Sequence, residues 1–155
     1  MSQLKCDHKS AGILVWNNGK LLLIERKNFP FGFAPPAGHL DSDTYEDAAK
    51  RELKEEVGLD VKSLKLLYEG RADTPCKRDR NGWHYWKIFE AQVEGSIERS
   101  QRETKQVGWY DLKQIKNLAD KTKIYRQSQI NNIDWERDPG IENVWIRWFN
   151  KLGIL

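Results

Sequence analysis

The sequence of 155 residues lacks most of the features that mark membrane and secreted proteins. No run of about 18 apolar residues occurs, so we expect no membrane-spanning helix. The first ten residues, MSQLKCDHKS, are polar and lack the apolar segment of a signal peptide. Only two cysteines are present, so we expect a cytoplasmic protein with reduced thiols rather than one stabilised by disulfides.

Strong charge of one sign is also absent. The 26 lysines and arginines nearly balance the 23 aspartates and glutamates, which gives a net charge of +3. The two signs are interspersed along the chain, which is not typical of a nucleic-acid-binding protein. A weakly basic balance is compatible with a small anionic ligand such as a phosphate. We therefore expect a small-molecule partner, with no nucleic acid and no membrane.

Repeats, low-complexity tracts and linkers are missing as well, so residues 1–155 are expected to form a single domain. The apolar pattern predicts strands at residues 11–16, 20–26, 64–72 and 83–93. The first two flank Asn17-Asn18-Gly19, which predicts a β-hairpin. Residues 28–40 contain three prolines and two glycines, so this segment is expected to be a loop or extended.

Three segments are predicted to contain helices. Residues 42–58 have capping residues at their start, and Gly58 is placed to end the helix. A strand end leading into a short helix is predicted at 108–119, and an amphipathic helix at 141–153. The last helix carries an apolar stripe that would face the core or a second copy in a homodimer: Trp145, Trp148, Phe149 and Leu152. Strands and helices without strict alternation predict the α+β class.

Three glutamates crowd one part of the first helix, in the stretch KRELKEEVGL at residues 50–59. Glu52, Glu55 and Glu56 lie three and four positions apart, so they share one face and repel one another. A solvated charged face is one interpretation. The other is a cation site, because Mg²⁺ binds carboxylates together with substrate phosphates. The preceding loop favours the cation site, since it could bring backbone carbonyls to the same place.

The segment AGHLDSDTYEDAAKRELKEEVGL closely resembles the signature of Nudix hydrolases. That signature is a glycine, five residues, a glutamate, seven residues, and then Arg-Glu-aliphatic-x-Glu-Glu-x-Gly-aliphatic. Residues 51–59 match its second part at every specified position. The first part departs twice, because only four residues separate Gly38 from Asp43 and because Asp43 replaces the glutamate.

This resemblance implies an α/β/α sandwich with a mixed sheet between helices, and a pyrophosphatase that uses Mg²⁺ or Mn²⁺. Such enzymes usually cleave a nucleoside diphosphate linked to another group, by attack of water on phosphorus. By position, Glu52, Glu55 and Glu56 would bind metal and activate water, with Glu55 as the catalytic glutamate. The carbonyl of Ala37 would be a backbone ligand, and Arg51 would orient the glutamates.

A general base in this family often comes from a loop downstream of the signature. Glu103, which precedes the strand-like VGWY, is the first candidate, and Glu98 is its competitor; an exposed loop acid without a role is the alternative. His39, beside the loop glycine, is a candidate for contact with phosphate. A loop histidine with no catalytic role is the alternative there.

Aromatic and basic residues supply candidates for substrate binding. Trp83 and Trp86 lie on opposite faces of one predicted strand, and one of them could stack on a nucleobase, with core packing as the alternative. Arg26 and Arg71 lie at predicted strand ends or turns. They would meet phosphates there or serve only as surface charge.

Two cysteines and two histidines are the right residue types for a zinc site: Cys6, His8, Cys76 and His84. Their spacing matches no standard zinc signature. Reduced thiols with unrelated histidines are therefore the default interpretation, and a zinc site is the alternative.

The sequence thus predicts a Mg²⁺-dependent Nudix pyrophosphohydrolase that acts on a nucleoside diphosphate derivative. The alternative is a nucleotide-binding sensor domain with the same fold and little turnover, which the altered first part of the signature motivates. The substrate stays open between oxidised nucleoside triphosphates, ADP-ribose, nucleotide sugars and dinucleoside polyphosphates.

Overall fold

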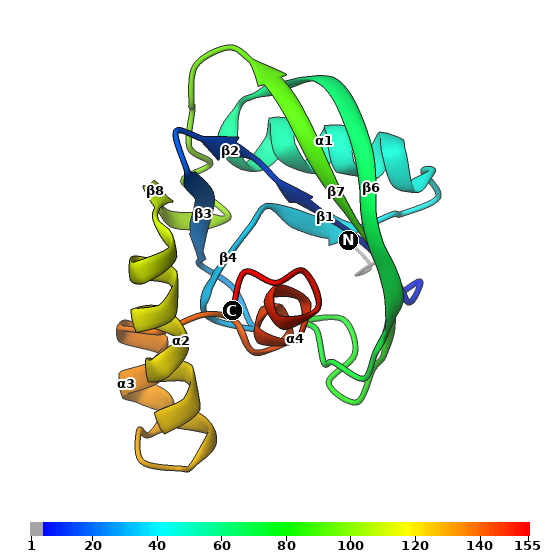
Figure 1. Ribbon diagram of the computed structural model, residues 1–155. Helices are drawn as coiled ribbons and strands as arrows, with labels where there is room; N and C mark the ends of the chain where they lie inside the picture. The colour runs from blue at the N-terminus through cyan, green and yellow to red at the C-terminus, as the bar shows by residue number, and fades with distance from the viewer. Residues whose placement is uncertain (1–4) are drawn as a thin grey trace.

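The computed structural model describes residues 5–155 and contains a mixed sheet of four strands. Its order is β5 (Ala37–His39), β1 (Lys9–Leu14), β7 (His84–Glu94) and β6 (Asp60–Ala72). The two central strands, β1 and β7, run parallel, and both outer pairs are antiparallel. The predicted α+β class with a mixed sheet is therefore confirmed (Figure 1).

A second sheet is built around β3 (Lys20–Arg26). This strand pairs antiparallel with β2 (Trp16–Asn17), β4 (Phe33–Ala34) and β8 (Thr104–Tyr110). The predicted hairpin is therefore only partly right. Asn18 and Gly19 have positive φ angles of 51° and 75° and form the tight turn from β2 to β3. However, β1 pairs with β5 and β7 in the first sheet, because its buried side chains fit between two helical layers.

Residues 5–155 also form four helices: α1 (Tyr45–Val57), α2 (Leu112–Arg126), α3 (Asn132–Arg137) and α4 (Asn143–Lys151). In α1 the Thr44 hydroxyl accepts a hydrogen bond from the Asp47 N–H, and Gly58 ends the helix with φ 79°. The helix predicted as short, α2, extends to Arg126. Helix α3 lies in a segment for which the sequence predicted no element, and it is held by buried Trp135, which stacks on Tyr125 at 4.2 Å between ring centroids.

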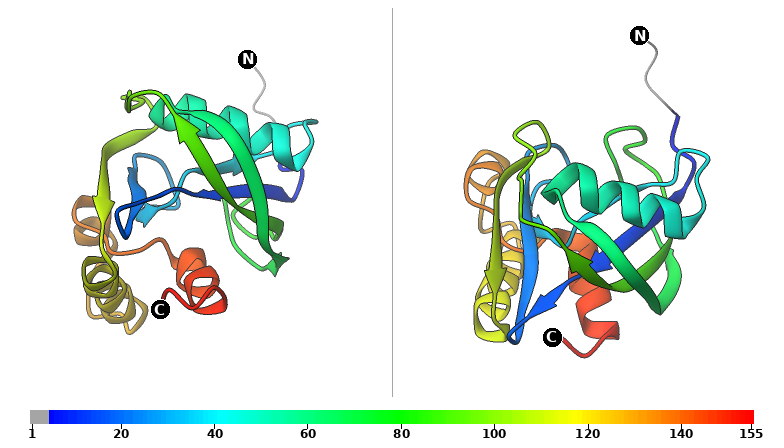
Figure 2. Two further views of the ribbon diagram at one scale, coloured as in Figure 1. Left: turned by 45° about the horizontal axis from the view of Figure 1, so that its top comes forward. Right: turned by 90° about the horizontal axis from the view of Figure 1, so that it is seen from above.

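The first sheet lies between α1 on one face and α4 on the other, as Figures 1 and 2 show. Alternate residues of β7 enter the two cores: Phe89 packs with α1, and Ile88 packs with α4. Gly12 of β1 allows α4 to approach closely, because a Cβ at this position would overlap the ring of Trp145. The predicted α/β/α sandwich is thus the observed arrangement.

The apolar stripe of α4 is part of this core. Trp145, Trp148 and Phe149 are each 0% exposed. The stripe is therefore not available to a second copy of the chain, and a homodimer would need another surface.

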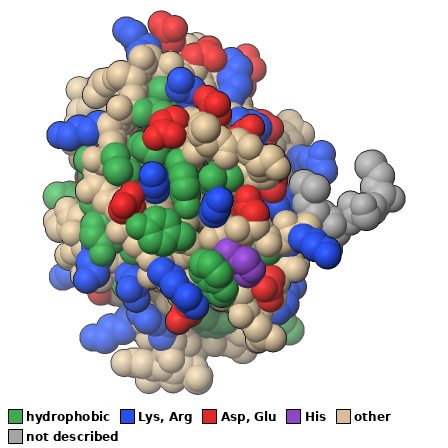
Figure 3. All heavy atoms as spheres, turned by 90° about the vertical axis from the view of Figure 1, so that its right-hand side faces the viewer, with side chains coloured by type: hydrophobic (Ala, Val, Ile, Leu, Met, Phe, Trp, Pro, Cys, Tyr) green, Lys and Arg blue, Asp and Glu red, His purple; other side chains and the backbone are tan. Residues whose placement is uncertain are grey.

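The side of the molecule where β6 lies carries side chains of mixed character. Figure 3 shows hydrophobic groups interspersed with Lys, Arg, Asp and Glu on this face. Exposed apolar side chains of β6 and of residues 83–85 include Leu66, Trp83 and Tyr85. Among the described helices, none combines the length and the apolar character needed to cross a membrane.

We expect Trp148→Ala to destabilise the fold strongly, because it removes a fully buried indole from the core between the sheet and α4. The loss should be about 3–5 kcal/mol of unfolding free energy, measured by urea denaturation followed by circular dichroism. Ile133→Ala in α3 is the matched control, since that side chain is 72% exposed. A Trp148 variant as stable as the control would contradict this account of the core.

Candidate active site

Three glutamates bring their carboxylates together at one end of α1. Glu52 and Glu56 lie one helical turn apart, and Glu103 comes from the segment just before β8. Oxygen atoms of the three side chains lie within 4.8 Å of one another. Glu52 is 8% exposed and Glu56 is 4% exposed. The interpretation of this face as merely solvated is therefore wrong for these two residues.

Strand β5 is in direct contact with this cluster. A Cβ at Gly38 would overlap the carboxylate of Glu52, so a larger residue would displace this carboxylate from its present position. The backbone N–H of Ala37 donates to Oε2 of Glu56 across 3.4 Å. The glycine that opens the signature therefore lies directly against a glutamate of the same signature.

Arg51 holds the loop after β5 against α1. Its Nη1 donates to Oε1 of Glu52 at 2.7 Å, and its Nε donates to Oδ2 of Asp43 at 2.9 Å. Its Nη2 donates to the carbonyl oxygens of His39 and Leu40, both at 3.0 Å. One guanidinium thus fixes the position of Glu52 relative to the loop. Asp43, the unusual residue of the signature, is one of its partners.

Glu55 lies outside the three-carboxylate cluster. Its side chain is 49% exposed, and its nearest cationic partner is Arg51 at 3.9 Å. On an α-helix, residue 55 is rotated by about 100° from residue 56, so the two side chains diverge. Glu103 takes the third place in the cluster, where the sequence predicted Glu55. Its competitor Glu98 is exposed and lies beside Gly58 instead.

Both clustered glutamates of α1 are held where negative charge is unfavourable. Burial raises the pKa of Glu52 to about 7, although neighbouring Arg51 acts in the opposite direction. Burial, followed by repulsion from Glu52, raises the pKa of Glu56 well above its ordinary range. In the absence of a cation the cluster therefore retains protons near neutral pH. A divalent cation would displace these protons and neutralise the carboxylates in their place.

The chemistry of this cluster fits Mg²⁺ or Mn²⁺. All of its side-chain donors are carboxylate oxygens, which these ions prefer over nitrogen or sulfur. The residues that would hold the ion are Glu52, Glu56 and Glu103. Ala37, predicted as a backbone ligand, lies in contact with the same group through its N–H.

A cleft of about 780 Å³ opens over the carboxylates. Beyond the glutamates, its wall is rich in basic and aromatic side chains: Arg26, Phe29, Phe31, Lys77, Arg78, Arg80, Trp86, Arg102 and Trp135. Carboxylates and cationic side chains thus line the same cleft, a combination that could hold an anion together with a metal ion. The size suits a nucleotide-like molecule.

The predicted substrate-binding residues separate into two groups. Arg26, Trp86 and His39 line the cleft. Arg71 and Trp83 are not among its lining residues; the Arg71 guanidinium lies 4.4 Å from the centroid of the Trp83 ring and pairs with Asp73 at 3.2 Å. The geometry therefore gives no support to a substrate contact for these two. Trp83 lies just before the first residue of β7, and its ring stacks on His8. This stacking holds the Trp83 side chain at the surface.

Two of the cleft residues predicted from the sequence to bind substrate also make contacts within the protein. Arg26 donates from Nε to the Pro30 carbonyl at 2.7 Å and lies 3.3 Å from Oε1 of Glu142. Trp86 is 6% exposed and packs on Trp145 with 5.6 Å between ring centroids. Core packing is therefore a large part of the role of Trp86. Its indole N–H has no hydrogen-bond acceptor among the described residues.

Sequence reasoning missed the aromatic and cationic pair Phe29 and Arg80. The Arg80 guanidinium lies 3.8 Å from the centroid of the Phe29 ring, and both residues line the cleft. A signal was present in the stretch NFPFGF, where three phenylalanines in a constrained loop are unusual for a surface connection. Arg80 had no such signal, because only the fold brings the β6–β7 connection to this loop.

The NUDIX domain family model matches residues 7–129 of the sequence. The chain belongs to this family. A curated relative, the ADP-ribose pyrophosphatase of Methanocaldococcus jannaschii, is 36% identical over 109 residues. That match takes in 68% of this chain and 63% of the relative, so the chain spans somewhat under two thirds of the length of the relative.

Solved structures of Nudix proteins share the fold. A NUDIX hydrolase from Nitrosomonas europaea superposes with a TM-score of 0.63 at 18% identity, over 88% of this chain and 93% of that one. The Nudix domain of Shewanella oneidensis NrtR, solved in complex with ADP ribose, superposes with a TM-score of 0.57 at 18% identity, over 75% and 79% of the two chains. At these identities the likeness establishes the sandwich fold.

We expect Glu56→Gln to raise the melting temperature of the protein in Mg²⁺-free buffer. Because the folded-state pKa of Glu56 is raised, its contribution to stability is full below the unfolded-state pKa and is lost as pH rises towards the folded-state value. Glutamine stays neutral, so the advantage of the variant should grow from pH 5 to pH 8. A difference of ~1 kcal/mol corresponds to a shift of about 2–4 °C in a chain of this size.

The matched control for this melting experiment is Glu46→Gln, at an exposed position in the first turn of α1. Added Mg²⁺ should stabilise the wild type and should stabilise the Glu56 variant less. A Glu56→Gln melting temperature that falls below the wild type at pH 8 would count against an electrostatically strained cluster.

Proposed function

We propose that residues 1–155 act as one Nudix domain that hydrolyses a nucleoside diphosphate linked to another group, with Mg²⁺ or Mn²⁺ as the cofactor. The observation that carries this proposal is the cluster of three carboxylates at the bottom of a cleft with cationic walls. Hydrolysis of a phosphoric anhydride needs negative charge to be neutralised and a water molecule to be positioned and deprotonated. The cleft contains groups suited to each task.

Glu103 is our candidate for the general base. Its carboxylate belongs to the cluster, yet it comes from a connection rather than from α1. It could accept a proton from a water molecule beside the substrate phosphate. The water oxygen would then form the new bond to phosphorus, and the bridging anhydride oxygen would leave with the other phosphate.

Arg51 has a positioning role in this scheme. Its hydrogen bonds to Glu52, Asp43 and two backbone carbonyls fix the carboxylate that faces the cleft. Basic residues of the wall, Lys77 and Arg102 among them, would attract the diphosphate. A bound divalent ion supplies positive charge to the phosphate oxygens and lowers the pKa of water.

For the substrate we propose ADP-ribose or a close analogue. The support is the 36% identity to a relative named ADP-ribose pyrophosphatase. The cleft offers Phe29 and Phe31 as aromatic surfaces for a base, which is compatible with an adenine but does not require one. The partner of the chain is then a small nucleoside diphosphate derivative.

A substrate panel tests this function. Wild-type protein with Mg²⁺ is incubated with ADP-ribose, a nucleotide sugar, a dinucleoside polyphosphate and an oxidised nucleoside triphosphate, and nucleoside monophosphate is measured by chromatography. We expect AMP from ADP-ribose at the highest kcat/KM, and loss of activity when Mg²⁺ is removed. Turnover of another diphosphate would replace the substrate assignment. Binding of ADP-ribose without turnover of any compound would favour the sensor alternative.

Glu103→Gln should lower kcat for the best substrate by about 10²–10⁴-fold, because it removes the group that accepts the proton from water. Glu98→Gln is the matched control: it changes a glutamate of the same connection that is exposed and outside the cluster. Steady-state kinetics of the two variants separate the candidates. If Glu98→Gln is the damaged variant and Glu103→Gln keeps most of the wild-type kcat, the assignment of the base is reversed.

A further inference from the structure

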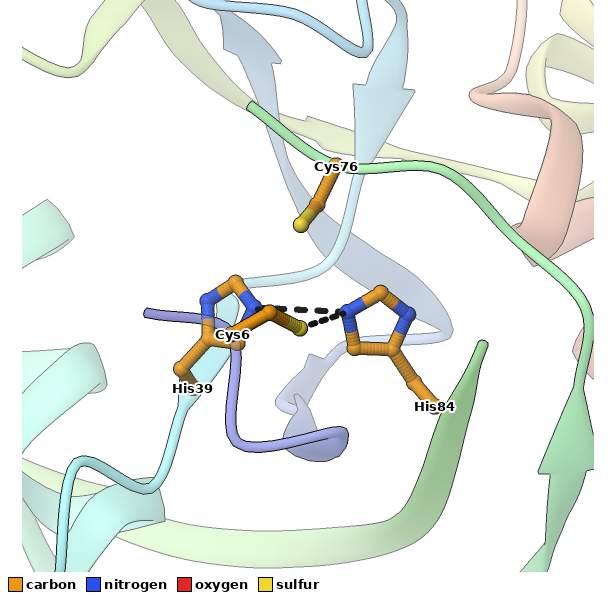
Figure 4. Close-up of side chains that lie close together, drawn as sticks. All are labelled: Cys6, His39, Cys76 and His84. Carbon is orange, nitrogen blue, oxygen red and sulfur yellow. Dashed lines mark hydrogen bonds between the residues drawn. The ribbon is translucent and has the colours of Figure 1, made fainter. Parts of the chain in front are cut away.

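A second cluster of ligand-type side chains lies beside the carboxylates and has no part in the proposed hydrolysis. Cys6, His39, Cys76 and His84 point toward one another, as Figure 4 shows. They come from four places in the chain: the segment before β1, the end of β5, the β6–β7 connection and the start of β7. One ligand atom from each lies within 4.8 Å of all the others.

The distances among three of the four ligand atoms match a tetrahedral metal site, and the Sγ of Cys76 lies within 4.8 Å of each of them. The two Nε2 atoms of His39 and His84 lie 3.3 Å apart. The Sγ of Cys6 lies 3.5 Å from Nε2 of His39 and 3.3 Å from Nε2 of His84. Zinc bound at ordinary bond lengths with tetrahedral angles separates two nitrogens by about 3.3 Å, and a nitrogen from a sulfur by about 3.6 Å.

Neighbouring groups orient the ligands toward the centre. The Nδ1 atom of His84 is engaged by the Thr74 hydroxyl at 3.1 Å, which leaves Nε2 to face the other ligands. The backbone N–H of Asp79 donates to Sγ of Cys76 at 3.2 Å, and two backbone hydrogen bonds close this turn. Such contacts hold a thiolate in place and stabilise its charge.

His8 is not a member of this group, although the zinc site considered as an alternative in the sequence included it. Its Nδ1 lies 2.8 Å from the Trp83 carbonyl oxygen, and its ring stacks on the Trp83 indole at 4.4 Å. His39 takes its place. Sequence spacing could not reveal this, because residue 39 reaches the site only when β5 pairs with β1.

The protonation states of the free ligands are those expected of buried groups. Burial lowers the pKa of His39 to about 4, so its imidazole is neutral and able to bind a metal ion. Burial raises the pKa of the Cys6 thiol to about 11. A zinc ion would deprotonate a coordinating thiol outright.

We propose that Cys6, His39, Cys76 and His84 bind one Zn²⁺ ion in a structural site. Four protein ligands close the coordination sphere, which is the pattern of structural rather than catalytic zinc. The ligand set of sulfur and nitrogen suits zinc, whereas the neighbouring set of carboxylates suits Mg²⁺. The two sites should therefore select different metals in one protein.

The consequence for the fold is that zinc fastens the β6–β7 connection beside the active site. Residues of that connection, Lys77, Arg78 and Arg80, line the cleft. The connection contains short turns and no helix or strand among its described residues, and it meets the rest of the fold through side chains. Arg78 pairs with Asp41 at 3.0 Å, and Arg80 lies over the Phe29 ring. A metal bond at Cys76 would hold these cations over the phosphate position.

Metal content tests the site without reference to enzyme activity. The protein is expressed in zinc-supplemented medium, freed of loosely bound ions by gel filtration, and analysed by plasma mass spectrometry. We expect about one zinc per chain in the wild type, and loss of zinc in Cys6→Ser and Cys76→Ser. Substitution with Co²⁺ should give the visible absorption of tetrahedral cobalt with thiolate charge-transfer bands in the wild type alone.

Two control variants make the assignment specific. His8→Asn changes a histidine that neighbours the cluster without belonging to it, and asparagine tolerates the positive φ of 60° there. Glu56→Gln changes the carboxylate site. Both should keep the zinc. A wild type without zinc, zinc that persists in both cysteine variants, or a Cys6–Cys76 disulfide detected by intact mass would overturn the proposal.

Limited trypsin digestion measures whether zinc orders the β6–β7 connection. Lys77, Arg78 and Arg80 are cleavage points within it. They should be protected in the zinc-loaded wild type and cut rapidly in Cys76→Ser or after zinc is stripped, with the fragments identified by mass. Equal cleavage rates with and without zinc would show that the ion does not order this segment. Neither zinc content nor cleavage rate depends on turnover. These experiments can therefore contradict the zinc site while the proposed hydrolysis stands, and the activity measurements can contradict the hydrolysis while the zinc site stands.

Discussion

The repulsion between two buried carboxylates governs the architecture of the active site. Glu52 and Glu56 lie one turn apart on α1, where burial raises the pKa of each. Side chains in that position cost stability unless a proton or a cation accompanies them. The fold tolerates the cost because α1 is fixed by a large apolar face, with Leu53 and Val57 fully buried against the first sheet. A helix anchored less firmly would turn its acids to solvent.

Arg51 explains why the altered first part of the Nudix signature is compatible with an ordered site. The spacer between Gly38 and Asp43 is one residue shorter than in the family pattern, and Asp41 and Ser42 both have positive φ angles, 50° and 77°. This tight turn brings the shorter aspartate within 2.9 Å of the guanidinium. A shorter acid in a tighter turn therefore still reaches the guanidinium of Arg51.

Local patterns in the sequence predicted what depends on local interactions. The bounds of α1 followed from its capping residues, and the stripe of α4 followed from its spacing. Pairing between distant segments was not accessible in this way. The apolar run of β1 looked like half of a hairpin. Its partner in the structure is the distant strand β7, and such a pairing depends on how the whole sheet assembles.

The same limit separates the predicted site residues that lie together at the cleft from those that do not. Glu52 and Glu56 lie on one helix, so their proximity follows from helical periodicity alone. Arg71 and Trp83 looked equally suitable as substrate ligands, yet they contact each other away from the cleft. The Cys/His cluster was considered with one wrong member, because its four ligands meet only through the pairing of β5 with β1 and of β1 with β7.

Strand β5 joins the two clusters, and its three residues show how. Gly38 faces Glu52, Ala37 donates its N–H to Glu56, and His39 points into the Cys/His cluster. Side chains alternate across a strand, so residues 38 and 39 must serve opposite sides. Among the described residues β5 is an edge strand, with β1 on one side of it, so contacts outside the sheet help to fix its position. Arg51 fixes it from one side through the His39 carbonyl, and a metal ion on the His39 ring would fix it from the other. The position of the glutamates would then depend on both.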